Sequence, residues 1–200
     1  MFRSSCMRPK NVEWSSRLIA LTAMMGALGN TLSAVSIGLT KVGQIGLDLS
    51  HVATFIAAIY GGPFMGFLVG LIGGFVPGLY FGPMGGLAWL GFIGLPIGKS
   101  LTGLTTGILF SLFNVGQRSH PSLFTVPVVL MGYAPECLFT VFFFLVLVPY
   151  FLGWVSVSLL IYILIKAWIE VALMSLFMGA LIGNGGFSNF MANFLTIRKV

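Results

Sequence analysis

Charged residues are scarce in this sequence. Of its 200 residues only 7% are charged, whereas 58% are hydrophobic, and the mean hydropathy is +1.04. About a quarter of the residues in an average soluble protein carry charge, so a surface this poor in charge would not stay dissolved. The scarcity excludes a soluble enzyme and indicates a chain that lives in a lipid bilayer.

Cysteines and catalytic motifs are also scarce. The two cysteines, Cys6 and Cys137, lie in a basic stretch and in an apolar run, so they provide neither a disulfide framework nor a zinc knuckle. The sequence contains no H-E-x-x-H, no G-x-S-x-G and no phosphate-binding P-loop. We therefore expect no enzymatic activity, no metal site and no cofactor.

The basic residues gather at the two ends of the chain. Ten Lys and Arg against four Asp and Glu give a net charge of +6. Seven of these basic residues lie near the termini or in one short polar loop: Arg3, Arg8, Lys10, Arg17, Arg118, Arg198 and Lys199. Nucleic-acid binding is excluded, since the basic residues form no continuous patch along the chain.

The apolar runs predict six membrane passes. A spanning helix needs about 20 apolar residues, because the hydrocarbon core is about 30 Å thick and a helix rises about 1.5 Å per residue. The run 52–79 is broken at Gly61-Gly62-Pro63, which favours a hairpin of two short helices. The predicted spans are 18–39, 49–60, 63–79, 87–113, 124–151 and 154–182. We expect an all-α six-transmembrane-helix bundle over residues 18–184, between a basic tail 1–17 and a tail 185–200.

The positive-inside rule supports this topology. Six passes place those seven basic residues on one side of the membrane and only Lys41 on the other. Both termini are then cytoplasmic, in a multi-pass protein of the cell membrane. A cleaved signal peptide is disfavoured, because its apolar core would span only about 7–15 residues, whereas this one continues to Leu39.

Small residues recur at the four-residue spacing that lets membrane helices approach closely. The third predicted span carries five glycines four apart: Gly62, Gly66, Gly70, Gly74 and Gly78. We interpret this ladder as a groove for a neighbouring helix of the same bundle. The first span carries Ala23 and Ala27, which serve either internal packing or docking of another protein.

Four charged residues fall inside the predicted spans, where each needs a partner, a wet cavity or a ligand. They are Lys99, Glu136, Lys166 and Glu170, at similar depth, with Lys166 and Glu170 on one helical face. Two interpretations stay open. Either the four are paired with one another and only fix helix packing, or one lysine is left for an anionic group of a ligand in an outward-facing cavity.

Polar and aromatic residues near the outer ends of the spans have two interpretations each. Asp48 and Ser50 precede an apolar helix, where they favour an N-cap, yet Asp48 and His51 could also recognise a ligand. Tyr80, Phe81 and Trp89 are typical of interface anchors, or the Gly/Pro hairpin that carries Tyr80 and Phe81 closes over an aromatic ligand.

These motifs together resemble the substrate-binding S components of energy-coupling factor (ECF) vitamin transporters. The likeness covers residues 17–185 and is greatest where Leu47-Asp48-Leu49-Ser50-His51 leads into Ile59-Tyr60-Gly61-Gly62-Pro63-x-x-Gly66. It implies a transmembrane coupling subunit that docks at Ala23 and Ala27, and two cytoplasmic ATPase subunits that supply the energy.

The resemblance also implies a vitamin-binding cavity. It would be lined or supported by Lys99, Glu136, Lys166 and Glu170, with Tyr80 and Trp89 near its mouth. The turn 82–87 is similar to that of biotin-binding members, except that Met84 replaces a threonine and a tyrosine is missing. The aspartate before the second span is closer to riboflavin-type members, so the vitamin stays open. A metal-transporting member is disfavoured, because the N-terminus lacks the expected His-containing segment.

Two other functions compete with vitamin import. One is a membrane assembly protein in which the buried charges are purely structural. The other is an ion-coupled secondary carrier, but such carriers usually contain inverted repeats, and no convincing repeat is present.

Overall fold

The computed structural model describes residues 16–40, 48–154 and 157–195, and over these ranges the chain is helical and contains no strand. The tail 1–15, the loop residue Lys41 and the C-terminal Arg198 and Lys199 lie outside the described residues. The elements are α1 (Ser16–Thr40), α2 (His51–Ile56) with its π-helical continuation η1 (Ala57–Gly61), α3 (Pro63–Gly73), α4 (Phe75–Phe81), α5 (Ala88–Leu112), the 3-10 turn η2 (Val115–Gln117), α6 (Pro121–Phe142) with the π-helical η3 (Phe143–Leu147), α7 (Val148–Leu152), α8 (Val157–Gly183) and α9 (Gly185–Leu195). The prediction of an all-α fold is confirmed.

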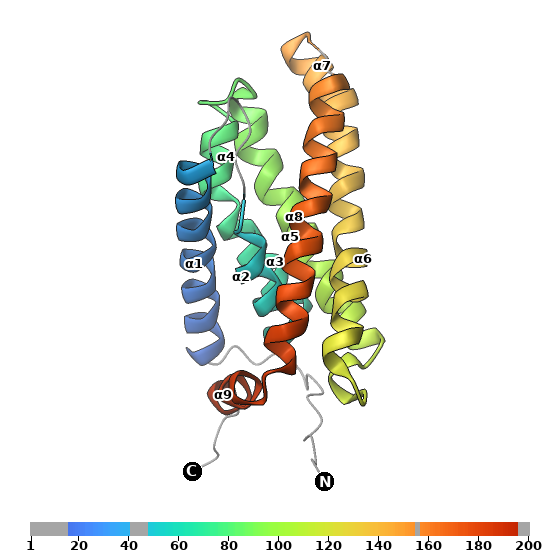
Figure 1. The fold of residues 1–200 in the computed structure, drawn as a ribbon. Helices are drawn as coiled ribbons and strands as arrows, with labels where there is room; N and C mark the ends of the chain where they lie inside the picture. Colours follow the sequence, from blue (N-terminus) through green and yellow to red (C-terminus); the bar gives the residue numbers. More distant parts are fainter. Residues whose placement is uncertain (1–15, 41–47, 155–156, 196–200) are drawn as a thin grey trace.

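The long helices run side by side along one axis (Figure 1). α1 lies on one flank, α6 and α8 lie on the other, and α2, α3 and α5 lie between them. α2 begins near the middle of the bundle rather than at its end, and α9 lies across the end at which α1 begins. The connections between α4 and α5 and between α7 and α8 lie at the opposite end.

Four helical segments are long and apolar enough to cross a membrane, which suggests a multi-pass membrane protein. They are Ser16–Leu39, Pro63–Phe81, Pro121–Leu152 and Val157–Gly183. Each coincides within a few residues with a predicted span. Helices also occupy the other two predicted spans: the apolar His51–Gly61, which is shorter, and α5.

The glycine ladder packs α3 and α4 against α5. A Cβ atom on Gly66 would lie 2.5 Å from the carbonyl oxygen of Gly103, and one on Gly78 would lie 3.0 Å from that of Phe92. Gly70 and Gly74 likewise face the α5 backbone, at Lys99 and Pro96. The predicted groove for a neighbouring helix is confirmed, and it positions Lys99 beside α2.

The packing of α1 uses the face beside the alanine pair. A Cβ atom on Gly26 would lie 2.6 Å from Ile72. The Asn30 amide donates to the Ile72 carbonyl oxygen (2.9 Å), and its Oδ1 accepts from the Val76 N–H (3.0 Å) across the α3–α4 junction. Ala23 and Ala27 are exposed. Of the two roles considered for this pair, internal packing belongs to Gly26 and Asn30 instead.

The C-terminal segment contains a helix that the sequence analysis did not anticipate. Within the region 185–200, expected to be a tail, α9 packs back on the bundle through the buried Met191. Asn184 Oδ1 accepts from the Phe187 N–H at 3.1 Å, as an N-cap does. The Tyr60 hydroxyl lies 3.0 Å from Ser188 Oγ, and Arg17 donates to the Phe194 carbonyl oxygen at 3.3 Å.

Candidate binding cavity

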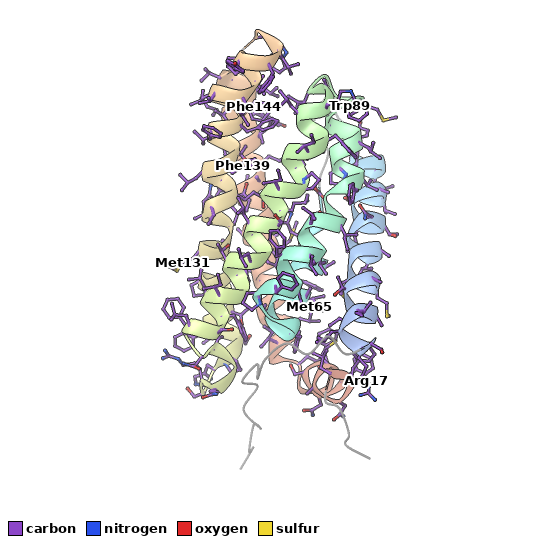
Figure 2. All side chains as sticks on the ribbon, turned by 180° about the vertical axis from the view of Figure 1, so that it is seen from behind. Arg17, Met65, Trp89, Met131, Phe139 and Phe144 are labelled. Atoms are coloured by element: carbon purple, nitrogen blue, oxygen red, sulfur yellow. The ribbon has the colours of Figure 1, made fainter. Side chains whose placement is uncertain are left out.

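A cavity of about 420 Å³ opens between α5, α6 and α8. It reaches from the connections at the end opposite α9, where Phe81, Leu87 and Trp154 line it, down to Asp48 and Lys99. Figure 2 shows Phe139 and Phe144, two of its lining residues, in the upper half of the bundle. The volume lies within the range of about 300–1,000 Å³ that is typical of small-molecule sites.

Six of the eight residues expected to bind a ligand line this cavity: Asp48, His51, Lys99, Glu136, Lys166 and Glu170. Tyr80 and Trp89 are not among its lining residues, and the Trp89 side chain is 70% exposed. Their neighbours Phe81 and Leu87 line the mouth instead. Asp48 and His51 lie beside Lys99 and Glu136 because α2 starts in the middle of the bundle (Figure 1). The sequence had not indicated this starting point.

Lys99 is held at the cavity floor by three partners. Its side chain is only 2% exposed, and Nζ donates to Asp48 Oδ2 at 2.6 Å and to Ser50 Oγ, and lies 3.2 Å from His51 Nδ1. An ammonium has three N–H donors, so these contacts use all of them. The prediction that Ser50 caps α2 is wrong, because its hydroxyl binds Lys99 and makes no cap hydrogen bond. Asp48 Oδ1 accepts from the Ser50 N–H at 3.0 Å, which holds the carboxylate in place.

His51 bridges Lys99 and Glu136. Its Nε2 lies 2.9 Å from Glu136 Oε2. Because an ammonium cannot accept a hydrogen bond, His51 Nδ1 must accept from Lys99, and the imidazole proton then sits on Nε2 and points to Glu136. Thr102 Oγ1 donates to the same Glu136 oxygen at 2.5 Å.

The second ion pair lies on α8, where Lys166 Nζ is 3.1 Å from Glu170 Oε1. The same oxygen accepts from the backbone N–H of Asp48 at 3.0 Å, so Glu170 links α8 to the residues that precede α2. The Lys166–Glu170 pairing confirms the shared helical face. Lys99 and Lys166 thus each have a carboxylate partner. This agrees with the interpretation that the charges are paired with one another, and differs from the one in which a lysine is left for an anionic ligand.

Aromatic side chains form much of the cavity wall, and apart from Phe81 the sequence did not lead us to expect them there. The aromatic residues that line the cavity are Phe81, Tyr133, Phe139, Phe143, Phe144 and Trp154. The signal was present: Tyr133 and Phe143 stand three positions before and seven after Glu136, which is the spacing of one helical face. Among the described residues no group of His, Cys, Asp and Glu side chains could hold a metal ion.

The cavity therefore combines apolar aromatic walls with a hydrogen-bonded, charged floor, an arrangement suited to holding a small amphipathic molecule. No protein-family model matches the chain, and comparisons with curated proteins and with solved structures find no significant similarity.

Proposed function

We propose that this protein is the membrane-embedded substrate-binding subunit of an ECF-type importer, and that it takes up a vitamin or related small molecule. The observation that carries the proposal is the 420 Å³ cavity, which has an aromatic wall and places six polar or charged side chains at mid-bundle. Charges inside an apolar bundle are costly and are typical of substrate pathways.

The proposal includes six passes: α1, α2 with η1, α3 with α4, α5, α6 through α7, and α8. α5 has 25 residues, which at about 1.5 Å per residue is long enough to cross the bilayer. The start of α1, the α5–α6 connection and α9 share one end of the bundle (Figure 1). Arg17 and Arg118 belong to that end, so the positive-inside rule makes it cytoplasmic. The cavity mouth is at the other end and faces outward.

The proposed partner subunits follow from the resemblance to ECF S components and from one feature of α1. Ala23 and Ala27 are exposed, and small exposed residues let a second helix approach closely. We propose that the transmembrane coupling subunit docks there. Two cytoplasmic ATPase subunits then supply the energy, and the protein itself catalyses no reaction.

A membrane assembly protein is the second candidate, and the paired lysines favour it, since ion pairs alone can fix helix packing. A measurement of small-molecule binding distinguishes the import subunit from the assembly protein. The protein is purified in detergent without partners, and small molecules that co-purify are identified by mass spectrometry and titrated back by calorimetry. An import subunit retains a ligand under these conditions, whereas an assembly protein does not.

A matched pair of variants tests whether the ligand binds in the cavity. Ala167 lines the cavity on α8, and Ala172 is exposed on the same helix. We expect Ala167→Trp to fill the cavity and abolish binding, and Ala172→Trp to leave it unchanged. Equal affinity in both variants would remove the cavity as the site and contradict the proposed function.

A further inference from the structure

The hydrogen bonds at the cavity floor leave carboxylate oxygens open. Both contacts to Glu136 use Oε2, from His51 and from Thr102. Within the described ranges Glu136 Oε1 accepts no hydrogen bond. The atom is also not fully buried, because the fully buried polar atoms that lack a partner there all belong to serine and threonine side chains. The side chain is 13% exposed and lines the cavity. Oε1 of Glu136 is therefore an acceptor that faces the cavity.

Glu170 repeats this pattern. Its Oε1 receives both Lys166 and the Asp48 backbone N–H, while Oε2 has no partner in the described part of the chain. The side chain is 11% exposed and also lines the cavity. Two separate helices, α6 and α8, thus each present one unfilled carboxylate oxygen to the same space.

The two lysines of the cavity lining do not supply hydrogen-bond donors for these open carboxylate oxygens. Lys99 has used all three of its N–H donors, and Lys166 is already paired with Glu170. Two lysines stand against three carboxylates in the cavity lining. Among these five side chains the carboxylates outnumber the ammonium groups by one. Glu136 is the carboxylate that no lysine contacts, since Lys99 pairs with Asp48 and Lys166 with Glu170, and an unneutralised charge in a dry site is costly.

The walls favour the same kind of ligand. Phe139, Phe143 and Trp154 line the cavity, and an aromatic face attracts a cation that lies within about 6 Å of its centre. Aromatic rings also pack against an apolar or aromatic ligand body. A positive centre at the floor and an apolar body above it would satisfy both parts of the cavity.

We propose that the ligand of this cavity is an organic cation with an apolar or aromatic body, whose positive centre binds the open oxygens of Glu136 and Glu170. The proposal rests on the proposed function and narrows it. It disfavours a biotin-like ligand, because the carboxylate of biotin would meet the open oxygens of Glu136 and Glu170. It also argues against the interpretation in which a lysine binds an anionic group of the ligand.

Three probes that share a phenyl ring and differ in net charge test the proposal: benzyltrimethylammonium, benzyl methyl ether and phenylacetate. Binding to the purified full-length protein is measured by saturation-transfer NMR and by tryptophan fluorescence, because Trp154 lines the cavity. One hydrogen-bonded or contacting charge corresponds to about tenfold or more in affinity. We expect benzyltrimethylammonium to bind at least that much more tightly than either other probe. Glu136→Gln should abolish the difference, while Ala172→Trp, on the exposed face of α8, should preserve it.

The outcomes separate the two proposals. Equal binding of the three probes, or a preference for phenylacetate, overturns the cation proposal and leaves the import subunit standing. No binding by any probe, together with no co-purified small molecule, contradicts both. The wild-type comparison does not depend on whether Glu136→Gln folds. As a second measurement, the co-purified molecule identified by mass spectrometry should carry a fixed or protonated positive charge, and an anionic molecule would overturn the proposal.

Discussion

Removing one member of the Lys99–Asp48 pair should destabilise the fold strongly. Lys99 is 2% exposed and its Nζ lies 2.6 Å from Asp48 Oδ2. At that distance and an effective dielectric constant of about 20, the attraction is about 6 kcal/mol. Part of it offsets desolvation of the two charges, and breaking a buried pair costs about 3–5 kcal/mol, because the remaining charge stays buried. Asp48→Asn should therefore lower the melting temperature by about 6–20 °C in a chain of this size.

A double-mutant cycle isolates the pair. Lys99→Met alone leaves Asp48 uncompensated, whereas Asp48→Asn combined with Lys99→Met removes both charges. We expect the double variant to be more stable than either single variant, because no lone charge is then buried. Thermal unfolding of the detergent-purified protein, followed by tryptophan fluorescence, measures all four species.

Lys166→Met provides the comparison variant. Lys166 is 24% exposed, so water screens its pair with Glu170 and the loss should be smaller than for Lys99. Single variants at Asp48 and Lys99 that melt at the wild-type temperature would refute the reasoning. Losses that simply add in the double variant would refute it as well.

Two further predictions concern packing. Gly66→Ala should destabilise the bundle by about 1–3 kcal/mol, because the new Cβ meets the Gly103 carbonyl oxygen; Gly38→Ala, which has open space around it, should not, and equal melting temperatures would contradict the packing of α3 on α5. Asn30→Ala should cost about 1–3 kcal/mol by removing hydrogen bonds from partly buried backbone groups at the α3–α4 junction. Faster hydrogen exchange at the Val76 amide would report that loss, and unchanged exchange would argue against it.

The helices were predictable from the sequence because apolar runs and glycine spacing are local signals. The run 124–151 became α6 through α7, and the Gly61-Gly62-Pro63 break became the turn between η1 and α3. The helix α9 was missed, because its apolar residues alternate with Gly, Ser and Asn in a segment too short to span a membrane.

The site was predictable only in part, since a residue's depth depends on where its helix starts. Lys166 and Glu170 share a helix, so their pairing follows from a spacing of four. Asp48 and His51 join Lys99 and Glu136 only because α2 begins at mid-bundle, and nothing local in the sequence reports that. Apart from Phe81, the aromatic residues of the wall were not predicted, because phenylalanines are so frequent in the apolar runs that the face toward Glu136 did not stand out.

The contact between Glu170 and Asp48 is chemically asymmetric. The donor is a main-chain N–H, which every amino acid except proline supplies, whereas the acceptor is one particular carboxylate. Sequence change at position 48 can therefore alter the charge of the cavity floor without detaching α8 from it. Apart from proline at position 48, only a change at position 170 removes this hydrogen bond, so the two ends of one contact tolerate very different degrees of variation.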